Sequence, residues 1–477
     1  MNKAILGLGV TVLVTAGAGA GAAFYLGNKT HDYLDEATNK IAAQMPFVRV
    51  AKIEHGKGIL NSTRTTTLNL GCAGSDGKPP FSLQVKENIQ HGPFPGWNTA
   101  ALTVIDSEIL LPAQAQEVVG AFFNGKPLYT ARTVVGFDGS YRQTVSIPAG
   151  QMTKPDGSKI IWHGMTGTAS GHKDKAHYTV DATSNGFEAS NAKDGAFLKI
   201  GRMHLKGEGE LALDALWAAT GKSEFIIDSA EAAFPSPSGQ AFKLKMDKVR
   251  FGSDTTLQQE LLTSTSRFSA SATFNDVKLD EIEMQASVKR LHRPTFTKVM
   301  QHMFKTAFTC EALRNPNAGP EMIQAMQSDL MQLLPHNPEY GLDKLRVVYA
   351  GKEASVSYTL GVNGVTAEDI KDLQPATMIP LLMPKMMFKA EGKLPIAWIG
   401  QMMAAMPRPA SQSALQPEVL AGMLQTAAAQ GWIIKEGEYI SSRFLFSNGQ
   451  MLLNDKPFQP PVPTTMADSS ASMAREQ

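Results

Sequence analysis

The longest regular feature of this chain is a series of short runs, from Phe47 to about Arg290, in which polar and apolar residues alternate. TRTTTLNL, YTARTVVGF and RFSASATF are examples, and a period of two residues is typical of β-strands. Asp-Gly or Asn-Gly pairs, which favour tight turns between antiparallel strands, separate several runs. These pairs are Asp138-Gly139, Asp156-Gly157, Asn185-Gly186 and Asp194-Gly195. The sequence therefore predicts a long antiparallel β meander.

A short amphipathic helix is expected ahead of the meander, over residues 30–45. Apolar residues recur there at helical spacing, and Pro46 ends the pattern because proline does not continue a helix. The residues on this stripe are Leu34, Ala37, Ile41 and Met45.

The helical period returns in the C-terminal part. From His292 to Leu334, apolar residues recur at i, i+3 and i+4 on both sides of a break at residues 315–320, which predicts a helical hairpin. Strands are expected again at KLRVVYA and ASVSYTLGVNG, followed by a Met- and Ala-rich helical region over about 395–430. Asn448-Gly449 then predicts a closing hairpin.

The N-terminus contains the only long uncharged run. Ala4 to Leu26 follow Lys3 and, as a helix rising about 1.5 Å per residue, would be long enough to cross a bilayer. The apolar first half and the Ala/Gly second half also fit a signal peptide with A-x-A cleavage sites. Phe24-Tyr25 favours a retained anchor, because aromatic residues concentrate at the membrane interface. Under either interpretation the rest of the chain is exported.

These patterns predict an α+β fold that is predominantly antiparallel β, with an N-terminal membrane helix, a large β meander and a C-terminal helical hairpin plus strands. We divide it into a signal anchor or signal peptide (1–27), a β-rich periplasmic domain with a short N-terminal helix (28–290), an α+β C-terminal domain (291–458) and a disordered tail (459–477).

Composition argues against several functions. The formal net charge is +1, so no overall positive field would attract nucleic acid, and we expect no nucleic-acid partner. The two cysteines, Cys72 and Cys310, match no metal-binding spacing, and no cofactor or metal is expected. They could form one long-range disulfide in an oxidising compartment or remain two buried thiols.

Several segments together resemble the YdgA-like family of Gram-negative envelope proteins, whose common domain has no known function. The resemblance lies in the N-terminal segment, in IEHGKGILNSTRTTTLNL (53–70), in NIQHGPFP (88–95), in the helical pair and strand near 295–360, and in the terminal NGQMLLNDKPF. It implies residence on the periplasmic side of the inner membrane and raises the question of a homodimer. It supplies no reaction and no catalytic residue.

Within HGPFP, the family motif residues are His91, Gly92, Pro93, Phe94 and Pro95. Two prolines end a strand because they lack an amide hydrogen, so a strand-terminating turn explains the segment. A ligand-binding or catalytic role for His91 is the alternative.

Methionine is concentrated in the last two fifths of the chain. Thioethers adapt to apolar ligands and partner helices, and in a periplasmic protein they can also bind Cu(I), with His302 as a further ligand. Ordinary core packing is the third interpretation. The binding candidates are Met300, Met303, Met383, Met386, Met387, Met402, Met403 and Met406.

The function expected from the sequence is that of a non-enzymatic envelope protein at the membrane, either binding an apolar or lipid-like ligand or serving as an interaction scaffold. The alternatives are an envelope-polymer hydrolase without a recognisable motif and a Met-rich copper binder. Two of His91, His163 and His204 beside a carboxylate in one pocket would favour the hydrolase.

Overall fold

The computed structural model describes residues 28–459 except 46–47, 59, 72–80, 173–174, 212–217, 236–240, 276, 308–325, 372–374 and 400–416. The predicted anchor (1–27), the predicted tail beyond residue 459, Cys72 and Cys310 lie outside the described residues. Among the helices that are described, none is both long and apolar enough to cross a bilayer.

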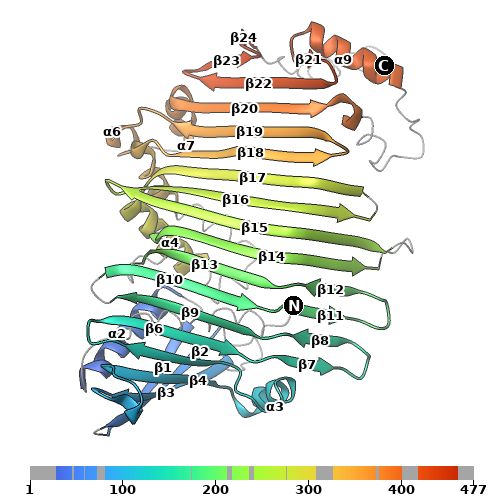
Figure 1. Ribbon diagram of the computed structural model, residues 1–477. Coiled ribbons are helices and arrows are strands. Elements are labelled where there is room, and N and C mark those ends of the chain that lie inside the picture. Colours follow the sequence, from blue (N-terminus) through green and yellow to red (C-terminus); the bar gives the residue numbers. More distant parts are fainter. Residues whose placement is uncertain are drawn as a thin grey trace, which may run out of the picture.

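A single antiparallel sheet forms the body of the protein, and its strands are stacked one above another along the molecule (Figure 1). At the N-terminal end, neighbouring strands follow one another along the chain, as in a meander. The first strands are β1 (Val48–Gly56), β2 (Asn61–Leu70), β3 (Phe81–His91), β4 (Thr103–Leu110), β5 (Thr130–Val135) and β6 (Ser140–Ile147). The predicted, predominantly antiparallel β architecture is thus confirmed.

The middle of the sheet consists of strands that are interrupted and then continue in the same direction. The pairs are β6 with β7 (Gly150–Thr153), β8 (Lys159–Trp162) with β9 (Met165–His172), β10 (Lys175–Ser184) with β11 (Phe187–Ser190), and β12 (Phe197–Ile200) with β13 (Met203–Glu210). Backbone hydrogen bonds between adjacent strands also form at the interruptions themselves, for example from the His163 amide to the Gly186 carbonyl (3.1 Å). The sheet therefore stays continuous across this line.

Long strands complete the sheet without further interruption. They are β14 (Thr220–Phe234), β15 (Phe242–Gln258), β16 (Leu261–Phe274), β17 (Val277–His292), β18 (Glu339–Tyr349), β19 (Lys352–Val362) and β20 (Met386–Pro395). The C-terminal end has β21 (Ile434–Glu436), β22 (Tyr439–Ser447), β23 (Gln450–Leu453) and β24 (Lys456–Pro457). Because β17 pairs with β18, the sheet runs through the predicted domain boundary at residues 290–291.

The helices lie at the margins of the sheet and against one of its faces (Figure 1). They are α2 (Asn28–Ala43), α3 (Ala113–Phe122), α4 (Arg293–Ala307), α6 (Ala367–Lys371), α7 (Pro375–Leu382) and α9 (Pro417–Ala429). Short 3-10 turns occur at η1 (Pro95–Trp97), η3 (Leu334–His336) and η4 (Met383–Lys385). The first helix of the predicted hairpin is confirmed as α4. Of the second helix, expected up to Leu334, residues 326–331 are helical, whereas its first part, up to residue 325, lies outside the described residues.

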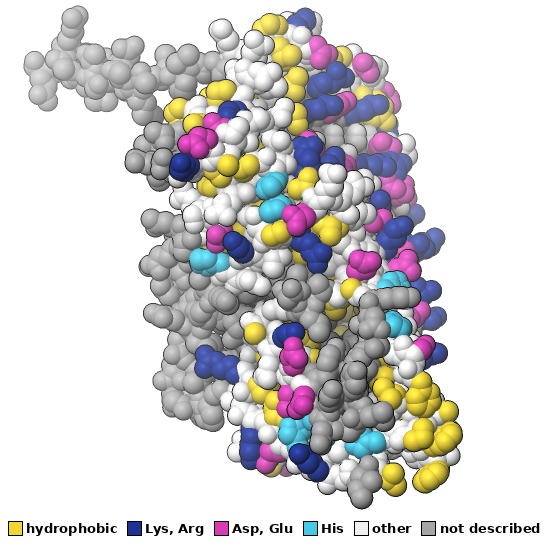
Figure 2. Space-filling view, turned by 90° about the vertical axis from the view of Figure 1, so that its left-hand side faces the viewer, with side chains coloured by type: hydrophobic (Ala, Val, Ile, Leu, Met, Phe, Trp, Pro, Cys, Tyr) yellow, Lys and Arg dark blue, Asp and Glu magenta, His cyan; other side chains and the backbone are white. Residues whose placement is uncertain are grey.

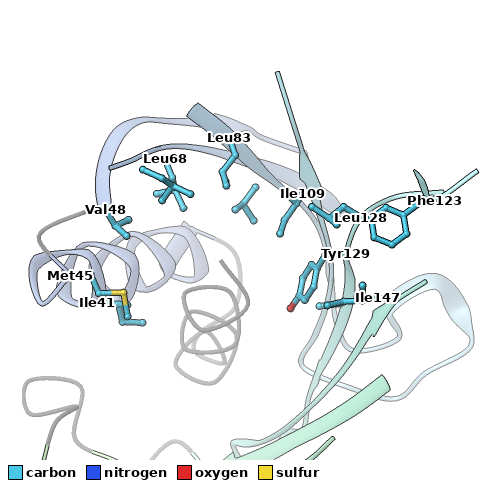
Figure 3. Packing of buried hydrophobic residues seen from close by; sticks show 13 residues of the cluster. Ile41, Met45, Val48, Leu68, Leu83, Ile109, Phe123, Leu128, Tyr129 and Ile147 are labelled. Carbon is cyan, nitrogen blue, oxygen red and sulfur yellow. The ribbon is translucent and has the colours of Figure 1, made fainter. Parts of the chain in front are cut away.

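The largest core lies between α2 and the strands β1 to β6. Ile41 of α2 and Met45, just after the helix, share one buried cluster with Val48, Leu68 and Leu83 of the strands (Figure 3). Strand β2 explains the packing, because its side chains alternate between buried and accessible along the strand, as a period of two requires. All four residues of the predicted α2 stripe are buried.

Two sequence predictions are corrected. The segment after β4 falls within the predicted β meander but contains the helix α3. This helix starts directly after Pro112, in a run of Ala, Gln and Glu that favours helix. Asn185-Gly186, read as a turn between antiparallel strands, instead separates the collinear strands β10 and β11. Asn448-Gly449 does form the predicted two-residue hairpin, with φ of 52° and 73°.

Candidate functional site

One face of the long strands carries an uninterrupted row of apolar side chains. In antiparallel strands, residues directly opposite each other share a face, and the register places seven apolar residues opposite one another on successive strands. The row is Leu205, Phe225, Phe251, Phe268, Met284, Leu345 and Val356, on β13 to β19. Phe251, Met284 and Val356 are 45%, 39% and 46% exposed, so the row is accessible rather than core.

The same face continues as a series of aromatic rings toward the C-terminal end. Tyr358 lies two residues after Val356 on β19, and its ring centroid is 6.2 Å from that of Tyr340 and 6.5 Å from that of Phe388. The Phe388 ring is in turn 5.9 Å from that of Phe444 on β22. These spacings lie in the range of aromatic pairs that attract each other. We call the two rows together the apolar face.

The opposite face of the same strands is charged. Arg250 on β15, next to Phe251, lies 3.8 Å from Glu224 on β14. Arg346, next to Leu345, bonds to Glu281 at 2.5 Å and to Glu353 at 2.7 Å on the two neighbouring strands. Figure 2 shows such side chains as a vertical band along its right-hand edge. The sheet is therefore amphipathic along its length.

A depression of about 460 Å³ lies on the charged face above Gly252, which has no side chain to fill it. Arg267, directly opposite Gly252, and Lys344 contribute to its lining. Lys344 bonds to Glu283 in the same depression. Charges of both signs therefore line it, which gives no clear preference for a cation or an anion.

The predicted methionines have different surroundings. Met303 on α4 packs against the cluster that includes Val299 and Met326. Met386 and Met387 are consecutive on β20, so their side chains point to opposite faces, and Met386 shares the apolar face with Phe388. Met300 is half-buried on α4, and Met383 is exposed in η4. Met402, Met403 and Met406 lie outside the described residues.

A second group of interacting side chains lies under the N-terminal half of α2. His91 of the family motif is 3.0 Å (Nε2) from the Ser62 hydroxyl, which is 3.0 Å from His31 Nε2. The Nδ1 atoms of His31 and His55 are 2.9 Å apart, and His55 Nε2 is 2.9 Å from Asp35. One set of neutral tautomers satisfies every link, with His91 donating to Ser62, Ser62 to His31, His31 to His55, and His55 to Asp35.

Arg64 joins this chain to the rest of the interface between α2 and the sheet. Its side chain is only 2% exposed, and it donates to Asp35 at 2.7 Å and to Glu87 at 2.5 Å. Its remaining nitrogen donates to the Thr38 hydroxyl and the Leu34 carbonyl. Burial raises the pKa of Glu87, and the Arg64 guanidinium lowers it in part. We call the two sets of contacts the α2 network.

His91, His163 and His204 do not come together in one pocket, which is the arrangement that would have favoured a hydrolase. His163 bonds to Glu188 at 3.2 Å and His204 to Asp181 at 3.0 Å, both pairs being partly exposed on the sheet. Of these three histidines, only His91 belongs to the α2 network. His302, the predicted helper for copper, lies 3.2 Å from Asp329. Within the described part of the chain, no three His, Cys, Asp or Glu side chains are grouped to hold a metal ion.

Sequence reasoning missed most of the α2 network, although a signal was present. His31, Asp35 and Thr38 recur at helical spacing on α2, beside the apolar stripe. Ser62 and Arg64 occupy inward positions of β2, on the same face of the strand as the buried Leu68 and Leu70. Polar residues at buried positions on two packed elements indicate a polar network between them.

Replacing Arg64 by alanine should destabilise the protein by about 3–5 kcal/mol, because it leaves the buried Glu87 carboxylate without its partner. The matched control is Arg132→Ala, which removes an exposed pair with Asp106 and should change stability by about 1 kcal/mol or less. Urea denaturation followed by circular dichroism measures both values. Equal effects of the two substitutions would show that the α2 network does not hold the helix.

The α2 network should also make stability depend on pH. Burial lowers the pKa of His91, and burial and then the nearby His55 lower the pKa of His31, although Asp35 opposes this. Between these lowered values and the unfolded value of 6.5, the unfolded chain binds more protons, so stability falls as pH falls through that window. Glu87, with its raised pKa, contributes with the opposite sign.

The substitution His91→Gln isolates the histidine contribution, because Gln keeps a donor for Ser62 and does not titrate. We expect the urea midpoint to fall less between about pH 7.5 and about pH 5.5 in His91→Gln than in the unmodified protein. Glu87 is present in both proteins, so its effect cancels. His204→Gln, at a partly exposed site on the sheet, serves as the control. An unchanged pH dependence in His91→Gln would contradict the assignment.

Comparisons with known proteins identify a family but no activity. A family model described as "Bacterial protein of unknown function (DUF945)" matches residues 1–461. No curated protein and no solved structure gave a match. The chain therefore belongs to the DUF945 family of bacterial proteins of unknown function.

Proposed function

We propose that this protein is an envelope protein held on the periplasmic side of the inner membrane, where it binds an apolar, lipid-like ligand along the apolar face. The observation that carries the proposal is the uninterrupted apolar row from Leu205 to Val356, backed by charged residues on the other side of the same strands. Soluble proteins rarely expose contiguous apolar surface, and larger patches of this kind mark binding sites.

The shape of the row favours an extended chain over a compact ligand. Seven strands at a spacing of about 4.8 Å make the row roughly 29 Å long, which is enough for an extended acyl chain, since such a chain spans half of the ~30 Å hydrocarbon core of a bilayer. The Leu, Phe, Met and Val side chains of the row offer no hydrogen-bond donor, so they suit an apolar ligand that forms no hydrogen bonds. Burying ten methylenes of an acyl chain would contribute about 8 kcal/mol, before the loss of translational and conformational entropy.

The proposed location rests on the sequence. The uncharged run at residues 4–26 after Lys3 fits a membrane anchor, and the resemblance to the YdgA-like envelope proteins suggests the same side of the same membrane. A lipid is the most abundant apolar molecule in that environment. The membership in a family without known function adds no reaction to this proposal.

Phe251→Gln should weaken lipid binding, because it places an amide in the middle of the apolar row and removes a ring 4.9 Å from that of Phe268. We expect the Kd for a phospholipid with a pyrene-labelled acyl chain to rise at least about tenfold, equivalent to ~1.4 kcal/mol. Pyrene fluorescence titration of the detergent-solubilised full chain measures it.

The control is Arg250→Gln, one residue away on the charged face, which should leave the Kd unchanged. Mass spectrometry of an organic extract from each purified protein should find bound lipid in the unmodified protein and in Arg250→Gln, and less in Phe251→Gln. If the unmodified protein carries no lipid and binds the probe only at background, the proposal is wrong. If it retains a protein instead, the scaffold alternative replaces it.

A further inference from the structure

Four large apolar side chains are exposed at one end of the N-terminal strands. Leu60, Phe94, Trp97 and Phe137 are 59%, 57%, 83% and 61% exposed. They belong to the connections β1–β2, β3–β4 and β5–β6, which an antiparallel meander places at the same end. Figure 2 looks onto this end of the strands and shows hydrophobic side chains gathered at its lower right. We call these four residues the apolar tip.

Backbone hydrogen bonds hold the three connections together. The His91 amide donates to the Leu60 carbonyl at 2.8 Å, which joins the first connection to the second. The Leu102 amide donates to the Val135 carbonyl at 2.8 Å, which joins the second to the third. The apolar tip is therefore a single built surface and not three independent loops.

The backbone of Trp97 adopts an unusual conformation, although its side chain is largely exposed. Its φ is 63°, in the left-handed region that disfavours residues with a Cβ, and the preceding Gly96 has a φ of 61°. Strained residues of this kind persist at functional sites, where the conformation displays a side chain. Here it displays an indole to the surroundings.

The apolar tip lies beside the start of α2. His91, at the end of β3, and His31, in the first turn of α2, contact the same Ser62 hydroxyl at 3.0 Å. The described part of α2 starts at Asn28, and in the sequence the predicted anchor comes directly before it. A membrane entered by that run would therefore meet this end of the sheet first.

We infer that the apolar tip inserts into the interfacial layer of the bilayer. Trp and Phe favour this layer because it accepts an apolar ring and also solvates the indole N–H. The inference rests on the proposed attachment to the membrane but concerns a surface separate from the apolar face. Insertion at a second point orients the body of the protein relative to the membrane, which a single anchor would leave free to swivel.

Tryptophan fluorescence tests the insertion directly, because residues 1–27 contain no tryptophan. The full chain is reconstituted into vesicles of phosphatidylethanolamine and phosphatidylglycerol, with and without dibrominated acyl chains. Bromine quenches a tryptophan that enters the lipid layer. We expect quenching in the unmodified protein, its loss in Trp97→Phe, and its retention in Trp432→Phe, which removes an exposed tryptophan near the C-terminal end of the sheet.

Two further variants separate this inference from folding defects and from the proposed function. Trp97→Gly suits a positive φ, so it should fold at least as well as the unmodified protein and still lose the quenching. Phe251→Gln should keep the quenching even though it loses the pyrene-labelled lipid. Unchanged quenching in Trp97→Phe and Trp97→Gly, or no quenching in the unmodified protein, overturns the inference. Burial of Trp97 by a second copy, seen as concentration-dependent emission without bromine quenching, overturns it as well.

Discussion

The register of the long antiparallel sheet is the constraint on which both of its faces depend. Side chains alternate along a strand, so a slip of one residue would move Phe251 to the charged face and Arg250 to the apolar face. Arg346 shows how the register is fixed, because its guanidinium contacts Glu281 on one neighbouring strand and Glu353 on the other. The hydrogen bonds that Arg346 donates to the Glu353 carboxylate and then to the Glu281 carboxylate raise the pKa of Arg346, because they favour its charged form. The charged pairs on one face and the apolar row on the other are therefore aligned by the same register.

The same sheet links the N-terminal end to the apolar face. Strands β6, β9, β10 and β13 connect the strands under α2 to Leu205, and the backbone hydrogen bonds continue across the line of interruptions. The core residues of α2 and the α2 network then attach the helix to the first strands. An anchor at residues 4–26 would therefore act on a continuous body and not on a separate lobe.

Features of the fold that depend on residues close together in the sequence could be predicted, whereas those that depend on pairing between distant strands could not. The α2 stripe was predicted correctly because Leu34, Ala37, Ile41 and Met45 follow the local helical period. The hairpin at Asn448-Gly449 is likewise set by two residues. The helix α3 was missed because a single short helix between strands has little sequence on which to establish a period. The apolar row was not recognised, because Leu205 and Val356 join it only through the register of five intervening strands.

The α2 network shows why the order of contacts does not by itself establish a reaction. Hydrogen bonds link Ser62, His31, His55 and Asp35 in an order that could activate a hydroxyl nucleophile. A substrate carbonyl must, however, approach the hydroxyl oxygen, and Ser62 is only 5% exposed beneath α2. In the set of tautomers given above the hydroxyl also accepts a hydrogen bond from His91, so it acts as a donor and as an acceptor within the protein. This burial and these contacts within the protein favour a structural role, in which the network fixes α2 to the first strands.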